Sequence, residues 1–345
     1  MERRTFITTS LLALPAILWA SPLSQRQLSG AVVVRAGLSR FGQPTPFRGV
    51  NPNDLKLSSR DTAGKLSTFE YVGVQKTGPS YHAHPNQDEV FYVVSGEYIF
   101  QVGPDKQLLK AGDLIFLPRN APHTWVQVSE RGQLFYFLQP AGKMEEFFLK
   151  MTESGGKASP EEMQRINAEH GIVPYGPPIS AEGPHTFSEY VQQGFVLRAG
   201  QRRSGESVII NGLSPNDLKV SGSDTGGELA IFEYSGHELG GPPLHVHPMQ
   251  DEVFYLTEGR YLFQCGEEQF TLEAGDMIFL PRNVAHTWAQ LTPKGKMLFF
   301  FQPAGKMEAF FSALGKMSGP PTSPEAGANL FADHDMQVVG PPLKY

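Results

Sequence analysis

Two histidines one residue apart, followed by a glutamate, stand in the segment Gly78 to Phe100, GPSYHAHPNQDEVFYVVSGEYIF. In a strand, side chains i and i+2 share one face with Cα atoms about 6.6 Å apart, so the imidazoles of His82 and His84 can converge on one ion. Glu89 follows after a short turn, and His123 begins a later strand-like stretch, HTWVQV. Neutral imidazoles and one carboxylate are a competent ligand set for a divalent transition metal. We therefore predict that these four residues bind a metal.

The same four-residue set occurs a second time, 163 positions further along the chain. Its members are His245, His247, Glu252 and His286. The alternative interpretation is that these are polar residues on a solvated face, which a lone histidine pair would usually be. Both sets are complete, however, although their neighbours have diverged: Leu244 stands where the first copy has Tyr81. We therefore predict one metal site in each half of the chain.

The repeat extends well beyond the histidines. The same offset aligns NPNDLK with SPNDLK, GDLIFLPRNAPHTW with GDMIFLPRNVAHTW, and LQPAGKMEEFF with FQPAGKMEAFF. The chain of 345 residues is thus a tandem duplication, and units of about 150 residues have the usual size of a domain. We predict a first domain over residues 31–178 and a second over residues 194–345.

A targeting segment is expected in front of the two domains. The opening MERRTFITTSLLALPAILWA carries Arg3 and Arg4, and its apolar run from Leu11 is too short to span a bilayer, which takes about 20 apolar residues. We predict a signal peptide of the twin-arginine type over residues 1–20, and therefore an exported protein, periplasmic or extracellular. The alternative is a mobile or membrane-anchoring N-terminal helix.

Composition narrows the class of partner. With 40% hydrophobic and 19% charged residues the chain can bury two ordinary cores. A net charge of −6 without clustered Lys and Arg argues against nucleic-acid binding. The single cysteine, Cys265, excludes an intramolecular disulfide and is expected to be buried and inert. We expect a monomer or homodimer without stable membrane insertion.

The elements that must position the ligands have the period-two pattern of strands. Within EVFYVVSGEYIFQVG, Ser95 and Gly96 interrupt the pattern as a hairpin turn would. Helix is expected only late in each unit, where Ser159 and Pro160 open a capping box and SPEAGANLFADH repeats it. Many short strands separated by Gly and Pro predict an all-β sandwich or barrel with short helices outside. Further strand candidates are VVVRAG, LSTFEYVG, DLIFLP, HTWVQV and QLFYFLQP.

On these residues the sequence resembles the bicupins. The first cupin motif is matched by His82, His84, Glu89 and Gly96, and the second by Gly112, Pro118 and His123, with the equivalent residues repeated in the second half. Two positions depart from the family pattern: Asn120 replaces a glycine but can also take a positive φ, and Gln127 replaces the final Asn. The resemblance implies two tandem cupin barrels, each a double-stranded β-helix or jelly roll.

Among bicupins the sequence is most similar to the quercetin 2,3-dioxygenase type. That resemblance implies a small-molecule substrate and O₂, with Glu89 and Glu252 acting as metal ligands and as bases. The metal would be Fe, Mn, Ni, Co or Cu, one per domain. An oxalate-decarboxylase-like enzyme is the main alternative, although no Arg stands just before either histidine pair, in TGPSYHAH or GGPPLHVH. A non-catalytic metabolite-binding bicupin is the other.

Four protein ligands leave positions open on a five- or six-coordinate ion, as in a site that binds a substrate. The strand face that carries the ligands also carries Phe91, Val93, Trp125 and Gln127. We therefore expect a mostly apolar and aromatic pocket with one amide. Phe100, Phe116, Phe135 and Phe137 are expected in the general core.

Overall fold

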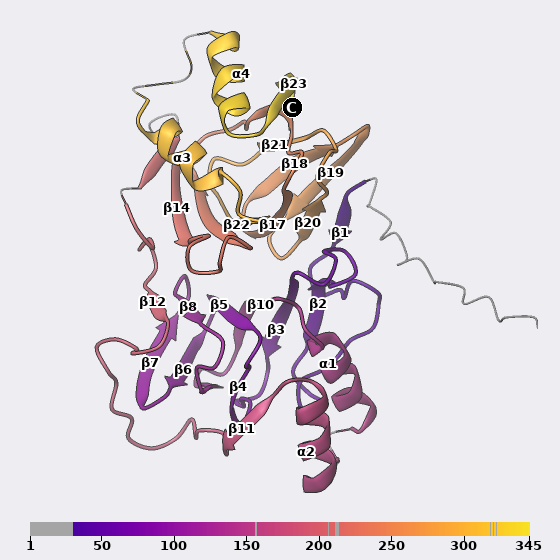
Figure 1. The fold of residues 1–345 in the computed structure, drawn as a ribbon, viewed down its shortest axis with the longest axis vertical. Helices are drawn as coiled ribbons and strands as arrows, with labels where there is room; N and C mark the ends of the chain where they lie inside the picture. Colours follow the sequence, from indigo (N-terminus) through magenta and orange to yellow (C-terminus); the bar gives the residue numbers. More distant parts are fainter. Residues whose placement is uncertain are drawn as a thin grey trace, which may run out of the picture.

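The computed structural model describes residues 30–345 except residues 156, 206, 211–213, 318, 320 and 322. Two antiparallel β domains are stacked on each other, the first drawn in indigo to magenta and the second in orange to yellow (Figure 1). The predicted signal peptide lies outside the described residues. No helix among the described residues is long and apolar enough to cross a membrane.

The first domain consists of two facing sheets. One has the strand order β12-β8-β5-β10-β3-β2 and the other the order β11-β4-β9-β6-β7. The strands are β2 (Asn53–Leu57), β3 (Ser67–Gly73), β4 (Tyr81–Ala83), β5 (Asp88–Ser95), β6 (Glu97–Val102), β7 (Asp105–Lys110), β8 (Leu114–Leu117), β9 (His123–Gln127), β10 (Gly132–Gln139) and β11 (Val173–Gly176).

The second domain repeats this architecture. Its sheets have the orders β1-β20-β17-β22-β15-β14-β13 and β19-β18-β21-β16-β23. The strands are β13 (Val208–Ile210), β14 (Ser214–Val220), β15 (Ala230–Gly236), β16 (Pro243–Val246), β17 (Asp251–Glu258), β18 (Arg260–Cys265), β19 (Glu268–Glu273), β20 (Met277–Leu280), β21 (His286–Gln290), β22 (Gly295–Gln302) and β23 (Gln337–Pro342). The predicted all-β jelly-roll fold is therefore confirmed for both halves.

The first strand of each half belongs to the sheet of the other half (Figure 1). Strand β1 (Val32–Val34) pairs with β20, and β12 (Phe195–Leu197) pairs with β8. Equivalent ion pairs fix the two exchanged segments: Arg35 lies 2.7 Å from Asp276, and Arg198 lies 3.0 Å from Asp113. The domain boundaries at residues 31–178 and 194–345 stay a prediction. In space the two halves exchange their first strands, so each large sheet contains one strand from the other half of the chain.

Three hydrophobic cores result from this arrangement. Two lie inside the barrels, and the third lies between the large sheets of the two domains. Phe135 stacks on Tyr255 of the other domain with 4.0 Å between ring centroids, and Phe137 meets Phe300 at 4.9 Å. Phe100 is in the first barrel, as expected, whereas Phe116, Phe135 and Phe137 belong to the core between the domains.

Two buried polar networks cross this interdomain core. Glu70 binds Lys56 at 2.8 Å and accepts a hydrogen bond from the hydroxyl of Tyr255, in the other domain, at 2.6 Å. In the equivalent network Glu233 binds Lys219 at 3.2 Å and accepts a hydrogen bond from Tyr92 at 2.8 Å. Each domain thus satisfies a carboxylate of its partner domain, which offsets the desolvation of these buried charges.

Each barrel carries two short helices on its outside. They are α1 (Met144–Glu153), α2 (Pro160–Glu169), α3 (Met307–Gly315) and α4 (Pro324–Asp333). The predicted starts of α2 and α4 are confirmed: their N-cap serines accept hydrogen bonds from backbone N–H groups, and a proline follows each serine. Helices α1 and α3 begin without a side-chain cap and were not predicted from the sequence.

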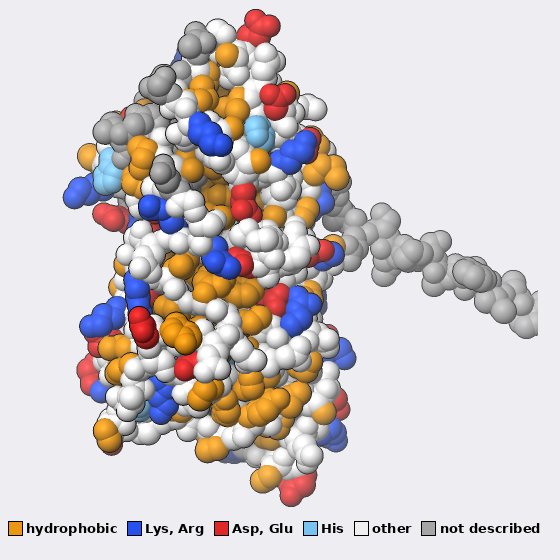
Figure 2. Space-filling view, turned by 60° about the vertical axis from the view of Figure 1, so that its left-hand side comes forward, with side chains coloured by type: hydrophobic (Ala, Val, Ile, Leu, Met, Phe, Trp, Pro, Cys, Tyr) orange, Lys and Arg blue, Asp and Glu red, His pale blue; other side chains and the backbone are white. Residues whose placement is uncertain are grey.

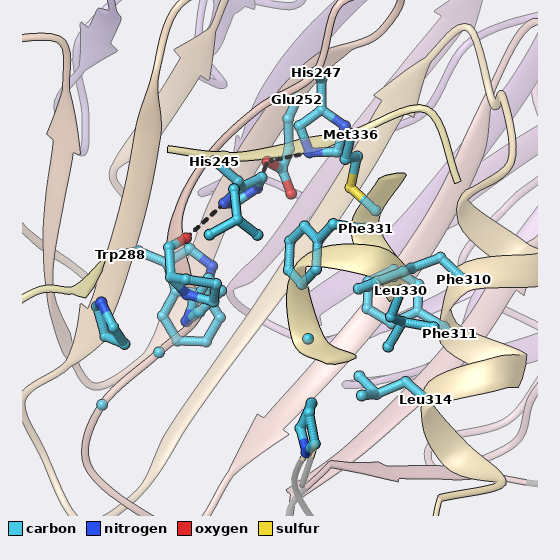
Figure 3. Close-up of a pocket in the computed structure, with 18 of the residues that line it drawn as sticks. His245, His247, Glu252, Trp288, Phe310, Phe311, Leu314, Leu330, Phe331 and Met336 are labelled. Atoms are coloured by element: carbon cyan, nitrogen blue, oxygen red, sulfur yellow. Dashed lines mark hydrogen bonds and ion pairs between the residues drawn. The ribbon is translucent and has the colours of Figure 1, made fainter. Parts of the chain in front are cut away.

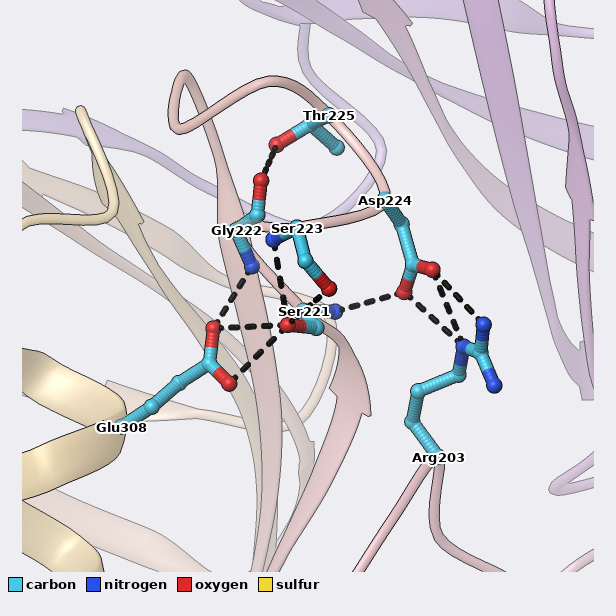
Figure 4. A network of polar contacts seen from close by, with 7 residues as sticks. All are labelled: Arg203, Ser221, Gly222, Ser223, Asp224, Thr225 and Glu308. Atoms are coloured by element: carbon cyan, nitrogen blue, oxygen red, sulfur yellow. Dashed lines mark hydrogen bonds and ion pairs between the residues drawn. The ribbon is translucent and has the colours of Figure 1, made fainter.

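Helix α3 is tied to the barrel through its first turn. The Glu308 carboxylate accepts hydrogen bonds from the Gly222 N–H at 2.6 Å and the Ser221 hydroxyl at 3.0 Å (Figure 4). In the same loop, Asp224 binds Arg203 at 2.8 Å. A carboxylate at a helix N-terminus is also favoured by the helix dipole, so this contact fixes where α3 lies.

The expected hairpin at Ser95–Gly96 is wrong. Strand β5 pairs with β8 and β10, whereas β6 pairs with β7 and β9, so the chain passes from one sheet to the other at Gly96. Gly96 has φ +84°, and a Cβ there would lie 2.6 Å from the Arg131 carbonyl oxygen. Asn120 takes φ +66°, as expected of its place in the second motif.

Candidate functional site

The structure brings the four predicted ligands of the first domain together. His82 is in β4 and directly opposite His123, the first residue of β9. Glu89 is the second residue of β5, and His84 follows the end of β4. One ligand atom from each residue lies within 4.8 Å of the others. The i, i+2 argument and the strand starts therefore predicted this placement correctly.

The ring orientations are set by backbone carbonyls. The Nδ1 atoms of His82 and His123 lie 2.7 and 2.8 Å from the carbonyl oxygens of Ser80 and Ala121. Such a contact requires the proton on Nδ1, so in a neutral ring Nε2 carries a lone pair. Both lone pairs then point into the cluster, which is the tautomer that a metal ligand needs.

Buried nitrogen and oxygen atoms of the ligands lie close together inside the cluster. His82 Nε2 lies 3.1 Å from His84 Nε2, and His123 Nε2 lies 2.6 Å from Glu89 Oε2. Neither His123 Nε2 nor Glu89 Oε2 has a hydrogen-bond partner, although both are buried. A cation at the centre of the cluster would satisfy all of these atoms, so the residues present fit a metal ion.

The electrostatics of the site favour the charge states of metal ligands. Burial and the nearby His123 and His84 lower the pKa of His82 to about 3, so that its ring is neutral at physiological pH. Burial alone would raise the pKa of Glu89, but His84 and His123 outweigh it and hold that pKa at about 2. At physiological pH the cluster therefore presents a neutral imidazole at His82 and a carboxylate anion at Glu89.

The second domain repeats the geometry. His245 and His286 are opposite each other in β16 and β21, and their Nδ1 atoms each lie 2.8 Å from a backbone carbonyl oxygen. Glu252 Oε2 lies 2.9 Å from His286 Nε2 and 3.6 Å from His247 Nε2. Burial lowers the pKa of His245 to about 3 and that of His247 well below its ordinary value. All eight predicted ligands thus form two sets, one in each domain.

A cavity of about 870 Å³ opens onto the second set (Figure 3). His245, His247 and Glu252 line it, together with Phe254 and Trp288 from the barrel. These two are the counterparts of Phe91 and Trp125, so the sequence predicted that part of the wall. Its other lining residues include Phe310, Phe311 and Leu314 of α3, Gly327, Ala328, Leu330 and Phe331 of α4, and Met336.

The expected amide is not in the cavity wall. Gln290, the counterpart of Gln127, is fully buried and donates a hydrogen bond to the Thr292 carbonyl at 2.7 Å. Gln127 similarly binds the carbonyls of Gly73 and Ser129. The cavity-lining side chains of α3 and α4 were not predicted, because the sequence pattern of a helix does not show which part of a barrel the helix packs against. The doubled Phe pair of KMEEFF and KMEAFF was the available signal.

The first domain differs at the same place. There the ring of Phe47 lies 6.0 Å from those of both Trp125 and Tyr71, and Trp125 is only 5% exposed. Arg48 donates a hydrogen bond to the carbonyl of Gly78, whose counterpart Gly241 lines the second cavity. The loop that carries Phe47 and Arg48 therefore covers this side of the first site.

On the face drawn in Figure 2, charged side chains of both signs lie between hydrophobic patches. Cys265 is buried, and burial raises the pKa of its thiol to about 11, so it is unreactive at neutral pH.

Comparison with known proteins gives a consistent result. A family model described as a cupin domain matches residues 69–137 and again residues 230–301. The quercetin 2,3-dioxygenase of Bacillus subtilis (strain 168) is 22% identical over 221 residues, which are 60% of this chain and 64% of that protein. The match thus spans just under two thirds of that relative's length.

Two solved structures share the fold at low sequence identity. Procruciferin, an 11S globulin from Brassica napus, has a TM-score of 0.55 at 10% identity over 82% of this chain and 86% of its own. Oxalate decarboxylase from Bacillus subtilis has a TM-score of 0.51 at 14% identity over 79% of this chain and 76% of its own.

Proposed function

Because the chain is a bicupin of the cupin superfamily with a metal-capable ligand set in each domain, we propose that it is a metal-dependent dioxygenase. The substrate would be an enol, a hydroxyketone or a flavonol-like aromatic compound, oxidised by O₂. The observation that carries this proposal is the deep aromatic cavity that ends on His245, His247 and Glu252. Likeness to a quercetin 2,3-dioxygenase supports it.

The second domain is proposed to hold the reacting site. His245, His247, Glu252 and His286 would hold a divalent transition metal, one of Fe, Mn, Ni, Co or Cu. When bound, the metal supplies Lewis acidity that favours the enolate form of the substrate and redox chemistry for O₂. The substrate is oxidised and both atoms of O₂ enter the product, so no external reductant is needed.

Glu252 is the proposed general base. Its carboxylate lines the cavity, where it can reach the hydroxyl proton of a bound hydroxyketone. A cation held by these ligands would lower the basicity of this carboxylate, and the negative charge of a bound enolate would restore part of it. The aromatic walls exclude water, which strengthens these interactions. Glu89 has the equivalent position in the first domain.

The cavity lining argues against a small dianion as substrate. Its described lining residues include neither Lys nor Arg, and oxalate would need such a cation besides the metal. A small decarboxylase substrate would also leave most of 870 Å³ unfilled. A non-catalytic metabolite-binding protein would consume no O₂ with any of these compounds, so an oxygen-uptake assay also tests that alternative.

The experiment is oxygen uptake with a panel of flavonols and diketones, using protein whose metal content is measured. Removing a general base typically slows turnover by about 10²–10⁴-fold, so Glu252→Gln should lose activity to that extent. Glu89→Gln is the matched control and should retain activity. The result that overturns the proposal is full turnover by Glu252→Gln with full metal, or a panel that never consumes O₂.

A further inference from the structure

The cavity of the second domain has two chemically different ends (Figure 3). His245, His247 and Glu252 lie at one end, and the other is enclosed by apolar side chains of α3 and α4. We call this second end, lined by Phe310, Phe311, Leu314, Gly327, Ala328, Leu330 and Phe331, the helical chamber. A bidentate hydroxyketone on a metal would occupy only the first end. An apolar chamber of this kind favours a ligand that fills it, because the walls otherwise face water.

A continuous aromatic wall joins the two ends. The ring of Phe331 lies 5.5 Å from that of His245 and 5.0 Å from that of Phe310. Phe310 in turn contacts Phe311 at 5.2 Å. A ligand bound at His245 can therefore extend along Phe331 into the helical chamber without crossing a polar surface. The Glu308 contact of Figure 4 holds the α3 side of this wall in place.

Two small residues of α4 leave room for the helical chamber. Gly327 and Ala328 line it, and α4 has no buried residue. At the equivalent positions of α2 the first domain has Met163 and Gln164, and α2 buries Ile166 to 1% exposure. Helix α2 is therefore packed down on its barrel, whereas α4 borders open space. A Cβ on Gly327 would meet only Pro321, at an ordinary 3.5 Å.

We propose that Gly327 and Ala328 determine ligand size, and that they make the two domains unequal. The second domain takes a ligand with a chelating head at the metal site and a bulky apolar extension in the helical chamber. The first domain, where Ile166 holds α2 against its barrel and Phe47 lies over Trp125, takes small chelators only. The placement of the chelating head at the metal site rests on the proposed function. The proposal that Gly327 and Ala328 of α4 limit ligand size does not depend on it.

The test is anaerobic calorimetric binding of three hydroxyketones that share one head: maltol, 3-hydroxychromone and 3-hydroxyflavone. In wild-type protein loaded with metal, affinity should rise along the series by on the order of tenfold for each of the two rings that are added between maltol and 3-hydroxyflavone. Gly327→Met should weaken 3-hydroxyflavone by on the order of tenfold and leave maltol unchanged. Asn329→Met, on the exposed face of the same helix, should change neither affinity.

A double variant separates the domains. In His245→Ala/His247→Ala only the first site keeps its ligands, so the preference for 3-hydroxyflavone should disappear. Equal affinities along the series in wild-type protein, or an unchanged preference in Gly327→Met, would overturn the proposal. If Gly327→Met does not fold, the wild-type series and the double variant decide. Size-dependent binding without oxygen uptake in air would defeat the dioxygenase proposal and leave this one standing.

Discussion

Replacing Tyr255 by phenylalanine removes one hydroxyl from the core between the domains. That hydroxyl donates to Glu70 at 2.6 Å and lies 3.1 Å from the amide nitrogen of Gln133. Tyr255 is fully buried, and so is the Lys56 side chain that neutralises Glu70. Water therefore cannot replace the lost donor, and the carboxylate keeps only its lysine and amide partners.

The expected destabilisation follows from these contacts. A hydrogen bond to a charged group contributes about 1.5–3 kcal/mol, so Tyr255→Phe should lower the free energy of unfolding by about 2 kcal/mol. Tyr92→Phe should have a smaller effect, because Glu233 retains two ammonium partners, Lys219 and Lys296, each at 3.2 Å. In Tyr255→Phe the aromatic ring at position 255 remains, so its stack on Phe135 is preserved.

Equilibrium urea denaturation followed by circular dichroism measures this effect. With a slope of about 3 kcal/mol per M, the midpoint of Tyr255→Phe should fall by about 0.7 M. Tyr98→Phe is the matched control: Tyr98 is equally buried, but its hydroxyl has no hydrogen-bond partner, so the midpoint should hardly move. If both variants unfold at the same urea concentration, the interdomain hydrogen bond does not contribute as argued.

Three further outcomes are expected. His82→Ala/His84→Ala should lose about one equivalent of metal by elemental analysis and keep the other, and an unchanged content would contradict the ligand assignment. Because burial lowers the pKa of His82 and His245 to about 3, the unfolded metal-free chain binds more protons than the folded one as the pH falls below 6.5. The free energy of unfolding should then decrease by about 1.4 kcal/mol per pH unit for each histidine down to pH 3, and urea midpoints that are constant from pH 7 to 5 would argue against this. N-terminal sequencing of native exported protein should begin near residue 21, and a sequence that starts within the first ten residues would rule out the proposed signal peptide.

The sequence by itself determined the ligand sets and the jelly-roll fold. His82 and His84 share a face because strand geometry has a period of two, and Glu89 and His123 stand at strand starts marked by turns. These relations are local, so a duplicated motif is enough to predict them. The capping serines of α2 and α4 were readable for the same reason.

Only the tertiary structure decided how the two halves meet. Strand β10 is buried on both faces, so the sequence QLFYFLQ has no alternation that tells Phe135, in the interdomain core, from Leu134, in the barrel. Pairing of β1 with β20 joins residues more than two hundred positions apart. No short-range pattern encodes a backbone pairing between exchanged strands, because any strand edge of suitable shape can accept it.

The difference between the two sites also required the fold. Their ligand sets are identical in type, and a large aromatic cavity among the described residues ends on the second set. That outcome depends on where Phe47 lies over Trp125 and on the open space beside Gly327 of α4. Neither is a property of the residues alone, because the volume of a cavity is what packing from several distant segments leaves unfilled.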